Sequence, residues 1–134
     1  MSGESAEHIR LVEYLIQIVE ARHKTARGIM IFADHHDYAG NRPPMIGGFK
    51  PDVFAHDLPP SFRIIGEAKT AKDFEEERSR RQIQAFLEHL ALYPNSSFYL
   101  AVPWFVKPKA NYAIKELRQS EHTNVRIEVV TVMG

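Results

Sequence analysis

Two acidic residues and a lysine stand in a pattern that suits divalent-cation chemistry. Asp52 follows Pro51, and Glu67-Ala68-Lys69 comes after fourteen intervening residues. Because side chains alternate along a β-strand, a strand here points Glu67 and Lys69 to one face and Ala68 to the other. Mg²⁺ prefers oxygen ligands and commonly takes one or two carboxylates together with water and phosphate oxygens. A lysine beside the ion could orient a water molecule or stabilise negative charge on a phosphate, so the chemistry we expect is phosphodiester hydrolysis.

The two carboxylates meet only in one strand register. Residues 47–57 and 62–70 are predicted to form a hairpin around Leu58-Pro59-Pro60-Ser61, because paired prolines cannot continue a ladder. If Asp57 and Phe62 close this hairpin, Asp52 lies directly opposite Glu67, with the Cβ atoms roughly 5 Å apart. Like charges in that position require a raised pKa or a bound cation. A slip of one residue would turn Asp52 to the wrong face.

The alternative interpretation is that Asp52, Glu67 and Lys69 are ordinary residues on a solvent-facing hairpin. Matches to motifs this short are common by chance. Their surroundings favour a site, because Glu67 follows Ile64-Ile65-Gly66 and Asp52 precedes Val53-Phe54. The charges therefore belong to the ends of strands that are otherwise expected to be buried.

The elements that would hold these residues are read from hydrophobic periodicity. Apolar residues at helical spacing predict a helix over residues 6–22 with Ser5 as its cap, and the stripe Ser79, Ile83, Phe86, Leu87 and Leu90 predicts another over 73–92 with Asp73 as its cap. The remaining elements that we predict are strands at 29–32, 97–102 and 125–132, a polar loop at 34–44, and a third helix at 109–120. The order α-β-β-β-α-β-α-β predicts an α/β fold with a mixed central sheet flanked by helices.

Composition limits the class of protein. The chain has 134 residues, 44% of them hydrophobic, which suits a single domain over residues 1–134. It has 17 basic and 17 acidic residues, so any surface that binds nucleic acid must be local. The absence of cysteine excludes thiolate metal sites and disulfides. No signal peptide or apolar run of about 20 residues is present, and we expect a soluble, cytoplasmic protein without a membrane partner.

The segments around Asp52 and Glu67-x-Lys69 resemble the PD-(D/E)XK nuclease superfamily, the fold of many restriction endonucleases. The resemblance implies a core of order αβββαβ, here extended by a C-terminal helix and strand. It also implies that Asp52, Glu67 and the backbone carbonyl of Ala68 bind Mg²⁺ or Mn²⁺ and that Lys69 assists the attacking water. The function expected from it is a metal-dependent DNA endonuclease.

Two residues on the predicted helices extend this resemblance. The N-terminal segment is similar to archaeal Holliday junction resolvases, which makes Glu7 a candidate further metal ligand; the alternative is that Glu7 only favours the positive end of its helix. Gln82 and Phe86 are similar to a Gln-x-x-x-Tyr element of exonuclease-like members, with phenylalanine in place of tyrosine. Gln82 is a candidate phosphate or water contact or else a surface residue, and Phe86 is expected in the core.

Several other side chains could contact DNA. Candidates for the phosphate backbone are Lys50, Arg42, Lys72, Arg78, Arg80 and Arg81. The alternative for Arg80 and Arg81 is pairing within the helix with Glu76 and Glu77, four residues earlier. His35, His36 and Asp37 look like a metal cluster, but we expect adjacent loop histidines to point apart. Trp104 and Phe105 could stack on a base, although we expect them in the core or in a dimer contact.

Three alternatives to the DNA endonuclease stay open. The first is a resolvase that acts on four-way junctions as a dimer. The second is a catalytically inactive DNA-binding or scaffold subunit that keeps the fold, and the third is a nuclease that acts on RNA. Because no sequence-reading module is evident, we expect specificity to come from DNA shape, a homodimer or a partner subunit.

Overall fold

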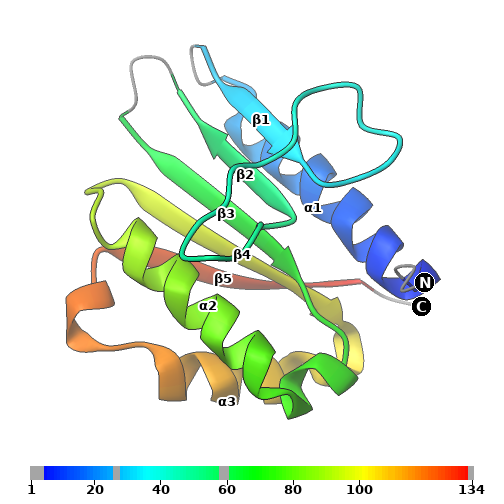
Figure 1. Ribbon diagram of the computed structural model, residues 1–134, viewed down its shortest axis with the longest axis vertical. Helices are drawn as coiled ribbons and strands as arrows, with labels where there is room; N and C mark the ends of the chain where they lie inside the picture. The colour runs from blue at the N-terminus through cyan, green and yellow to red at the C-terminus, as the bar shows by residue number, and fades with distance from the viewer. Residues whose placement is uncertain (1–4, 26–27, 58–60, 133–134) are drawn as a thin grey trace.

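The computed structural model describes residues 5–25, 28–57 and 61–132. The predicted order of helices and strands is confirmed, with short 3₁₀ helices between some of them (Figure 1). The elements are α1 (Ala6–His23), β1 (Met30–Ala33), β2 (Val53–His56), β3 (Arg63–Ala68), η1 (Lys72–Glu75), α2 (Glu77–Leu90), β4 (Ser96–Pro103), η2 (Trp104–Val106), α3 (Lys107–Leu117), η3 (Ser120–His122) and β5 (Val125–Val132).

The five strands form one mixed sheet in the order β1-β2-β3-β4-β5. Strands β1, β2 and β3 are antiparallel neighbours, whereas β3, β4 and β5 run parallel. The β2–β3 register pairs Val53 with Gly66 and His56 with Arg63. This is the register that the sequence analysis predicted, and it puts Asp52 next to Glu67 at the end of the hairpin. The apex of the hairpin, residues 58–60, lies outside the described residues.

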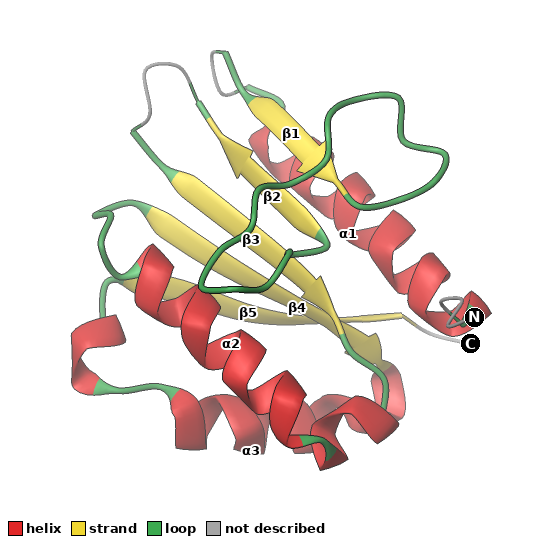
Figure 2. Cartoon of the chain, viewed as in Figure 1, coloured by secondary structure: helices red, strands yellow, loops and turns green. Residues whose placement is uncertain are grey.

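Helices cover both faces of the sheet (Figure 2). Helix α1 packs on one face, where its buried side chains contact Ile64 and Tyr99. Helices α2 and α3 pack on the other face, against Ile65 and Phe98. The alternation of Ile64 and Ile65 between the two cores explains why β3 reads as a continuous apolar run. A strand buried on both faces has no solvent side on which to place polar residues.

The buried face of α2 is the predicted one, but the start of the helix is not. Ser79, Ile83, Phe86, Leu87 and Leu90 are all buried, as the periodicity indicated. The helix begins at Glu77, so the prediction of Asp73 as its cap was wrong. The Asp73 carboxylate instead accepts hydrogen bonds from the backbone and hydroxyl of Thr70, which stabilise the preceding 3₁₀ turn. Aspartate competes for nearby backbone donors in turns as readily as at helix ends.

The strand predicted from residue 47 begins only at Val53. Gly47 and Gly48 have φ angles of 59° and 87°, and Ile46 and Phe49 form an isolated bridge around them. This left-handed backbone makes a tight turn rather than a strand, and glycine adopts it without steric cost. The turn directs the chain into Pro51 and Asp52.

Other sequence predictions are wrong where tertiary packing determines the partner or the exposure of a side chain. Arg80 pairs with Glu116 of α3 at 2.6 Å rather than with Glu76 of its own helix. Trp104 and Phe105 are 56% and 59% exposed, so the prediction of a place in the core was wrong, while the alternative of a dimer contact stays a prediction. Helix α1 does start at Ala6 with Ser5 accepting a hydrogen bond from the backbone of His8, as predicted. Over the ranges that the structure describes, no helix is both long and apolar enough to cross a membrane.

Asp57 holds the hairpin end of β2 to the start of β3. Its carboxylate accepts hydrogen bonds from the backbone N–H and hydroxyl of Ser61 and from the backbone N–H of Phe62. Desolvation raises the pKa of Asp57, but the hydrogen bonds from Ser61 and Phe62 outweigh it and hold that pKa at about 2. The ionised carboxylate therefore stabilises the hairpin.

We expect Asp57→Asn to lower the melting temperature Tm at neutral pH. A depressed pKa contributes stability that is present above the ordinary aspartate pKa of about 3.9 and is lost as the pH falls through the folded-state value. The difference in Tm between wild type and variant should therefore shrink between about pH 4 and pH 2. Thermal melts followed by circular dichroism across this range test it, and a pH-independent difference would contradict the role of the charge.

Candidate active site

The candidate site lies where β3 ends and β2 begins. Asp52 directly precedes β2, Glu67 belongs to β3, and Lys69 directly follows β3. The backbone N–H of Asp52 donates to Glu67 Oε1 at 3.0 Å, and the backbone N–H of Ala68 donates to Asp52 Oδ2 at 2.8 Å. Because β2 and β3 are antiparallel, the first residue of one meets the last residues of the other. The two main-chain hydrogen bonds orient the carboxylates within the same small space.

Burial separates these residues from the other charged side chains. Asp52, Glu67 and Lys69 are 6%, 3% and 6% exposed. Of the Asp, Glu, Lys and Arg residues in the described part of the chain, these three are the buried ones. Lys69 Nζ lies 3.4 Å from Glu67 Oε2, as the strand alternation predicted. Buried charges are rare unless they are paired or have a function, so the solvent-facing alternative for these residues was wrong.

The electrostatics of the cluster are unbalanced toward negative charge. Desolvation raises the pKa of Glu67 well above its ordinary value, and the neighbouring Asp52 carboxylate raises it further. The ammonium group of Lys69 lowers the pKa of Glu67 but does not offset those effects. The buried lysine pairs with Glu67, and ionising both neighbouring carboxylates costs free energy that a bound cation would recover.

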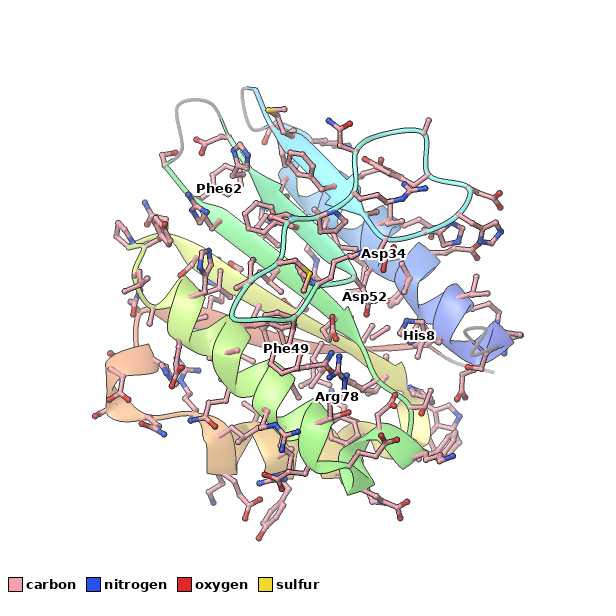
Figure 3. The ribbon with its side chains drawn as sticks, in the orientation of Figure 1. His8, Asp34, Phe49, Asp52, Phe62 and Arg78 are labelled. Atoms are coloured by element: carbon pink, nitrogen blue, oxygen red, sulfur yellow. The ribbon has the colours of Figure 1, made fainter. Side chains whose placement is uncertain are left out.

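His8 is a member of the site that the sequence analysis missed. Its Nε2 lies 3.3 Å from Asp52 Oδ1, and Figure 3 shows the two side chains next to each other between α1 and the sheet. The signal was present in the sequence, because His8 precedes the buried residues Leu11, Val12 and Leu15 by three, four and seven positions. These spacings put His8 on the face of α1 that packs on the sheet.

Glu7, the predicted acid on this helix, points elsewhere. It lines a cavity of about 60 Å³ together with Arg10, Leu11, Pro103, Trp104, Phe105 and Val132. Consecutive helical residues are about 100° apart around the axis. The first turn of α1 therefore directs His8 to Asp52 and Glu7 to the end of β4. Among the described residues, no contact of Glu7 with Asp52 or Glu67 supports its predicted role as a metal ligand.

Gln82 reaches the site from the opposite face of the sheet. Its side-chain oxygen accepts a hydrogen bond from Lys69 Nζ. Gln82 is half-buried on α2, one turn before the fully buried Phe86, whose predicted place in the core is confirmed. The bond holds the ammonium group between Glu67 and α2, which limits the directions in which it can point.

The residues predicted to contact phosphates include exposed cations and one arginine that is hydrogen-bonded to the backbone. Lys50, Arg78 and Arg81 are exposed, and Figure 3 shows Arg78 beside Phe49, with its guanidinium carbon 5.1 Å from the ring centroid. Arg42 instead donates to the backbone carbonyls of Ala33 and Tyr38, so it stabilises the loop after β1.

The loop histidines do not point apart, contrary to the prediction. The rings of His35 and His36 stack with centroids 4.7 Å apart, and ligand atoms of His35, His36 and Asp37 lie within 4.8 Å of one another. Both ring nitrogens of His35 are already in contact, one with the backbone N–H of Asp37 and the other with Glu13 at 3.0 Å. These contacts give His35 a role in shaping the loop.

The donor atoms at Asp52 and Glu67 fit a hard divalent cation. Each carboxylate oxygen has two lone pairs and can accept another partner beyond the contact it already makes. Mg²⁺ and Mn²⁺ prefer such oxygens, and a ligand set of two carboxylates with one backbone carbonyl, that of Ala68, leaves positions for water and phosphate. A cation there would also stabilise the ionised form of Glu67, whose pKa is raised by burial and then by the Asp52 carboxylate.

A scan against models of protein families, a search of curated proteins and a search of solved structures each found no match.

We expect Glu67→Gln to raise the Tm in the presence of a chelator. A raised pKa means that the folded state keeps its proton to higher pH than the unfolded chain, so the free energy of unfolding falls as the pH rises above about 4.3. The variant escapes this loss, and its advantage over wild type should grow as the pH rises above about 4.3 toward the raised folded-state pKa of Glu67.

Thermal melts with and without Mg²⁺ provide the measurement. Mg²⁺ should raise the Tm of the wild type and leave that of Glu67→Gln nearly unchanged, because the variant lacks one ligand charge. Glu121→Gln, at an exposed acid, is the matched control and should behave as wild type. An advantage that does not change with pH would contradict the electrostatic account.

Proposed function

We propose that this protein is a divalent-metal-dependent nuclease that hydrolyses phosphodiester bonds in DNA. The observation that carries the proposal is the buried cluster of Asp52, Glu67 and Lys69, which are the only buried Asp, Glu, Lys or Arg side chains of the described ranges. Burying two carboxylates and one lysine costs free energy, and groups held in this way at the end of two strands are typical of functional sites.

The fold agrees with the proposal. The order α1-β1-β2-β3-α2-β4 corresponds to the αβββαβ core expected of PD-(D/E)XK nucleases, and α3 and β5 correspond to the additional helix and strand. The acidic residue before β2 and the Glu-x-Lys at the end of β3 agree with the motif of that superfamily. Membership of the superfamily is part of the proposal.

Each side chain has a role that follows from its position. Asp52 and Glu67, with the carbonyl of Ala68, would hold Mg²⁺ or Mn²⁺, which on binding would polarise the phosphate and lower the pKa of the attacking water. Lys69 would donate hydrogen bonds to the water or to a nonbridging phosphate oxygen. The water oxygen forms a bond to phosphorus and gives up a proton to solvent, while the bond from phosphorus to the leaving sugar oxygen breaks and that oxygen takes up a proton from solvent. The products are a phosphate monoester and an alcohol.

His8 and Gln82 would act as positioning residues. His8 contacts Asp52 from α1, and Gln82 accepts from Lys69 on the other side of the sheet. Each limits the rotamers of the side chain that it contacts, and preorganised groups lose little free energy on reaching the transition state. The exposed cations Lys50, Arg78 and Arg81 are candidates for the flanking phosphates.

The DNA endonuclease is preferred over the junction resolvase. The resolvase interpretation depended on Glu7 as a metal ligand, but Glu7 lines the cavity beside Trp104 and Phe105 rather than the site of Asp52 and Glu67. An inactive scaffold is disfavoured because a scaffold has no need to bury Glu67 beside Asp52.

Cleavage assays test the proposal directly. Purified protein incubated with supercoiled, linear and single-stranded DNA should cleave with Mg²⁺ or Mn²⁺ and lose activity with a chelator. Asp52→Ala and Glu67→Ala should abolish detectable cleavage, and Lys69→Ala should lower kcat about 100-fold or more, because it removes a charged donor to the transition state. Glu121→Ala is the matched control for the acidic residues. Cleavage that survives both the chelator and Asp52→Ala would refute the mechanism.

Replacing Gln82 by leucine removes the hydrogen bond that positions Lys69 but keeps the charge of Lys69. We expect kcat to fall about 10- to 100-fold with little change in KM, because a hydrogen bond to a charged group contributes about 1.5–3 kcal/mol and Gln82 contacts Lys69 rather than the substrate. Gln82→Asn shortens the side chain and should restore only part of the rate. Equal activity of Gln82→Leu and wild type in steady-state assays would mean that Lys69 needs no positioning.

A further inference from the structure

Two adjacent exposed aromatic side chains, Trp104 and Phe105, directly follow β4. Over the ranges that the structure describes, the exposed aromatic residues are Trp104, Phe105 and Tyr112, at 56%, 59% and 63% exposure. The rings of Trp104 and Phe105 are perpendicular, with centroids 5.8 Å apart. Trp104 and Phe105 begin η2 directly after Pro103, the last residue of β4. Adjacent exposed aromatics are a large apolar surface to leave in water, and such patches mark binding sites.

These aromatics lie at the same edge of the sheet as the candidate active site. Strands β3 and β4 run parallel with Ala68 paired to Ala101, and Lys69 donates its backbone N–H to Ala101 at 3.0 Å. Lys69 and Trp104 therefore follow the C-terminal ends of neighbouring parallel strands.

The first turn of α1 links the two places. His8 contacts Asp52, whereas Glu7 and Arg10 line the cavity with Trp104 and Phe105. The aromatics and the carboxylate pair therefore both lie beside the first turn of α1, so one nucleic-acid strand that passes this end of the helix can contact both.

The segment that carries the aromatics is cationic, whereas the η1 segment that packs on α3 is acidic. Residues 104–115 contain Lys107, Lys109 and Lys115, all exposed, and no acidic residue. Arg10 adds a further cation at the cavity, where Glu7 is the acidic residue in its lining. Glu116, the next acidic residue along α3, is engaged by Arg80. Cations interleaved with aromatic rings are the usual composition of surfaces that bind single-stranded nucleic acid.

We propose that Trp104 and Phe105 stack on unpaired bases of a nucleic-acid strand whose phosphate lies at Asp52, Glu67 and Lys69. The proposal rests on the proposed nuclease function and specifies its substrate class: DNA with a single-stranded segment next to the cleaved bond. A duplex keeps its bases stacked on one another and offers no free ring face, so it engages the lysines but not the aromatics. The aromatic pair thus sets a preference for single-stranded or branched DNA.

The test uses the fact that Trp104 is the only tryptophan of the chain. Intrinsic tryptophan fluorescence therefore reports on this position without a label. A thymidine oligonucleotide of about 12 nucleotides, within the length that one such surface covers, is titrated in the presence of a chelator so that it is not cleaved. We expect quenching of the fluorescence with the single strand and much weaker quenching with a duplex of equal length.

Variants connect the quenching to affinity. Trp104→Ala and Phe105→Ala, measured by anisotropy of a labelled oligonucleotide, should each weaken binding about 5- to 150-fold, and Trp104→Phe should restore part of it. Leu92→Ala, at an apolar side chain that is 75% exposed and belongs to no part of this surface, is the matched control. Circular dichroism confirms that each variant is folded.

The outcomes separate the two proposals. Quenching without any Asp52-dependent cleavage supports the stacking surface and refutes the nuclease. Asp52-dependent cleavage without quenching, or equal quenching by duplex and single strand, refutes the stacking surface and leaves the nuclease. If Trp104→Ala changes only the self-association of the protein in sedimentation experiments, the surface is a contact between copies of the chain and the stacking proposal is wrong.

Discussion

The cost of burying two carboxylates beside one lysine is the constraint on which this structure depends. Asp52 and Glu67 are each tied by a backbone N–H of the other strand, so the pair cannot move apart without breaking the β2–β3 register. Lys69 supplies one positive charge where two negative charges meet. Such a cluster persists only because the surrounding fold overdetermines it, and a divalent cation would stabilise the ionised form of both carboxylates.

The mixed sheet is what makes this meeting possible. Strand β3 has an antiparallel neighbour on one side and a parallel neighbour on the other. The C-terminal end of β3 lies beside the start of the antiparallel strand β2, which Asp52 precedes. It also lies beside the end of the parallel strand β4, which Trp104 follows. A sheet of one kind alone would not bring these two segments to one edge.

The helices on the two faces complete the cluster from opposite sides. Helix α1 brings His8 to Asp52, and α2 brings Gln82 to Lys69. Both helices are fixed by apolar stripes that pack on the same strand, through Ile64 on one face and Ile65 on the other. The positions of the polar contacts are therefore consequences of core packing, and core substitutions in either helix would act on the candidate site at a distance.

The sequence alone determined the order of the elements, the hairpin register and the trio Asp52, Glu67 and Lys69. These depend on local rules, namely the alternation of side chains, the period of a helix and the inability of paired prolines to continue a ladder. Only the tertiary structure decided that His8 rather than Glu7 faces Asp52, that Arg80 pairs with Glu116, and that Trp104 and Phe105 are exposed. Those outcomes depend on contacts between segments far apart in the chain, which packing sets. The local spacing indicates that His8 lies on the packing face of α1, but not that Asp52 lies opposite it.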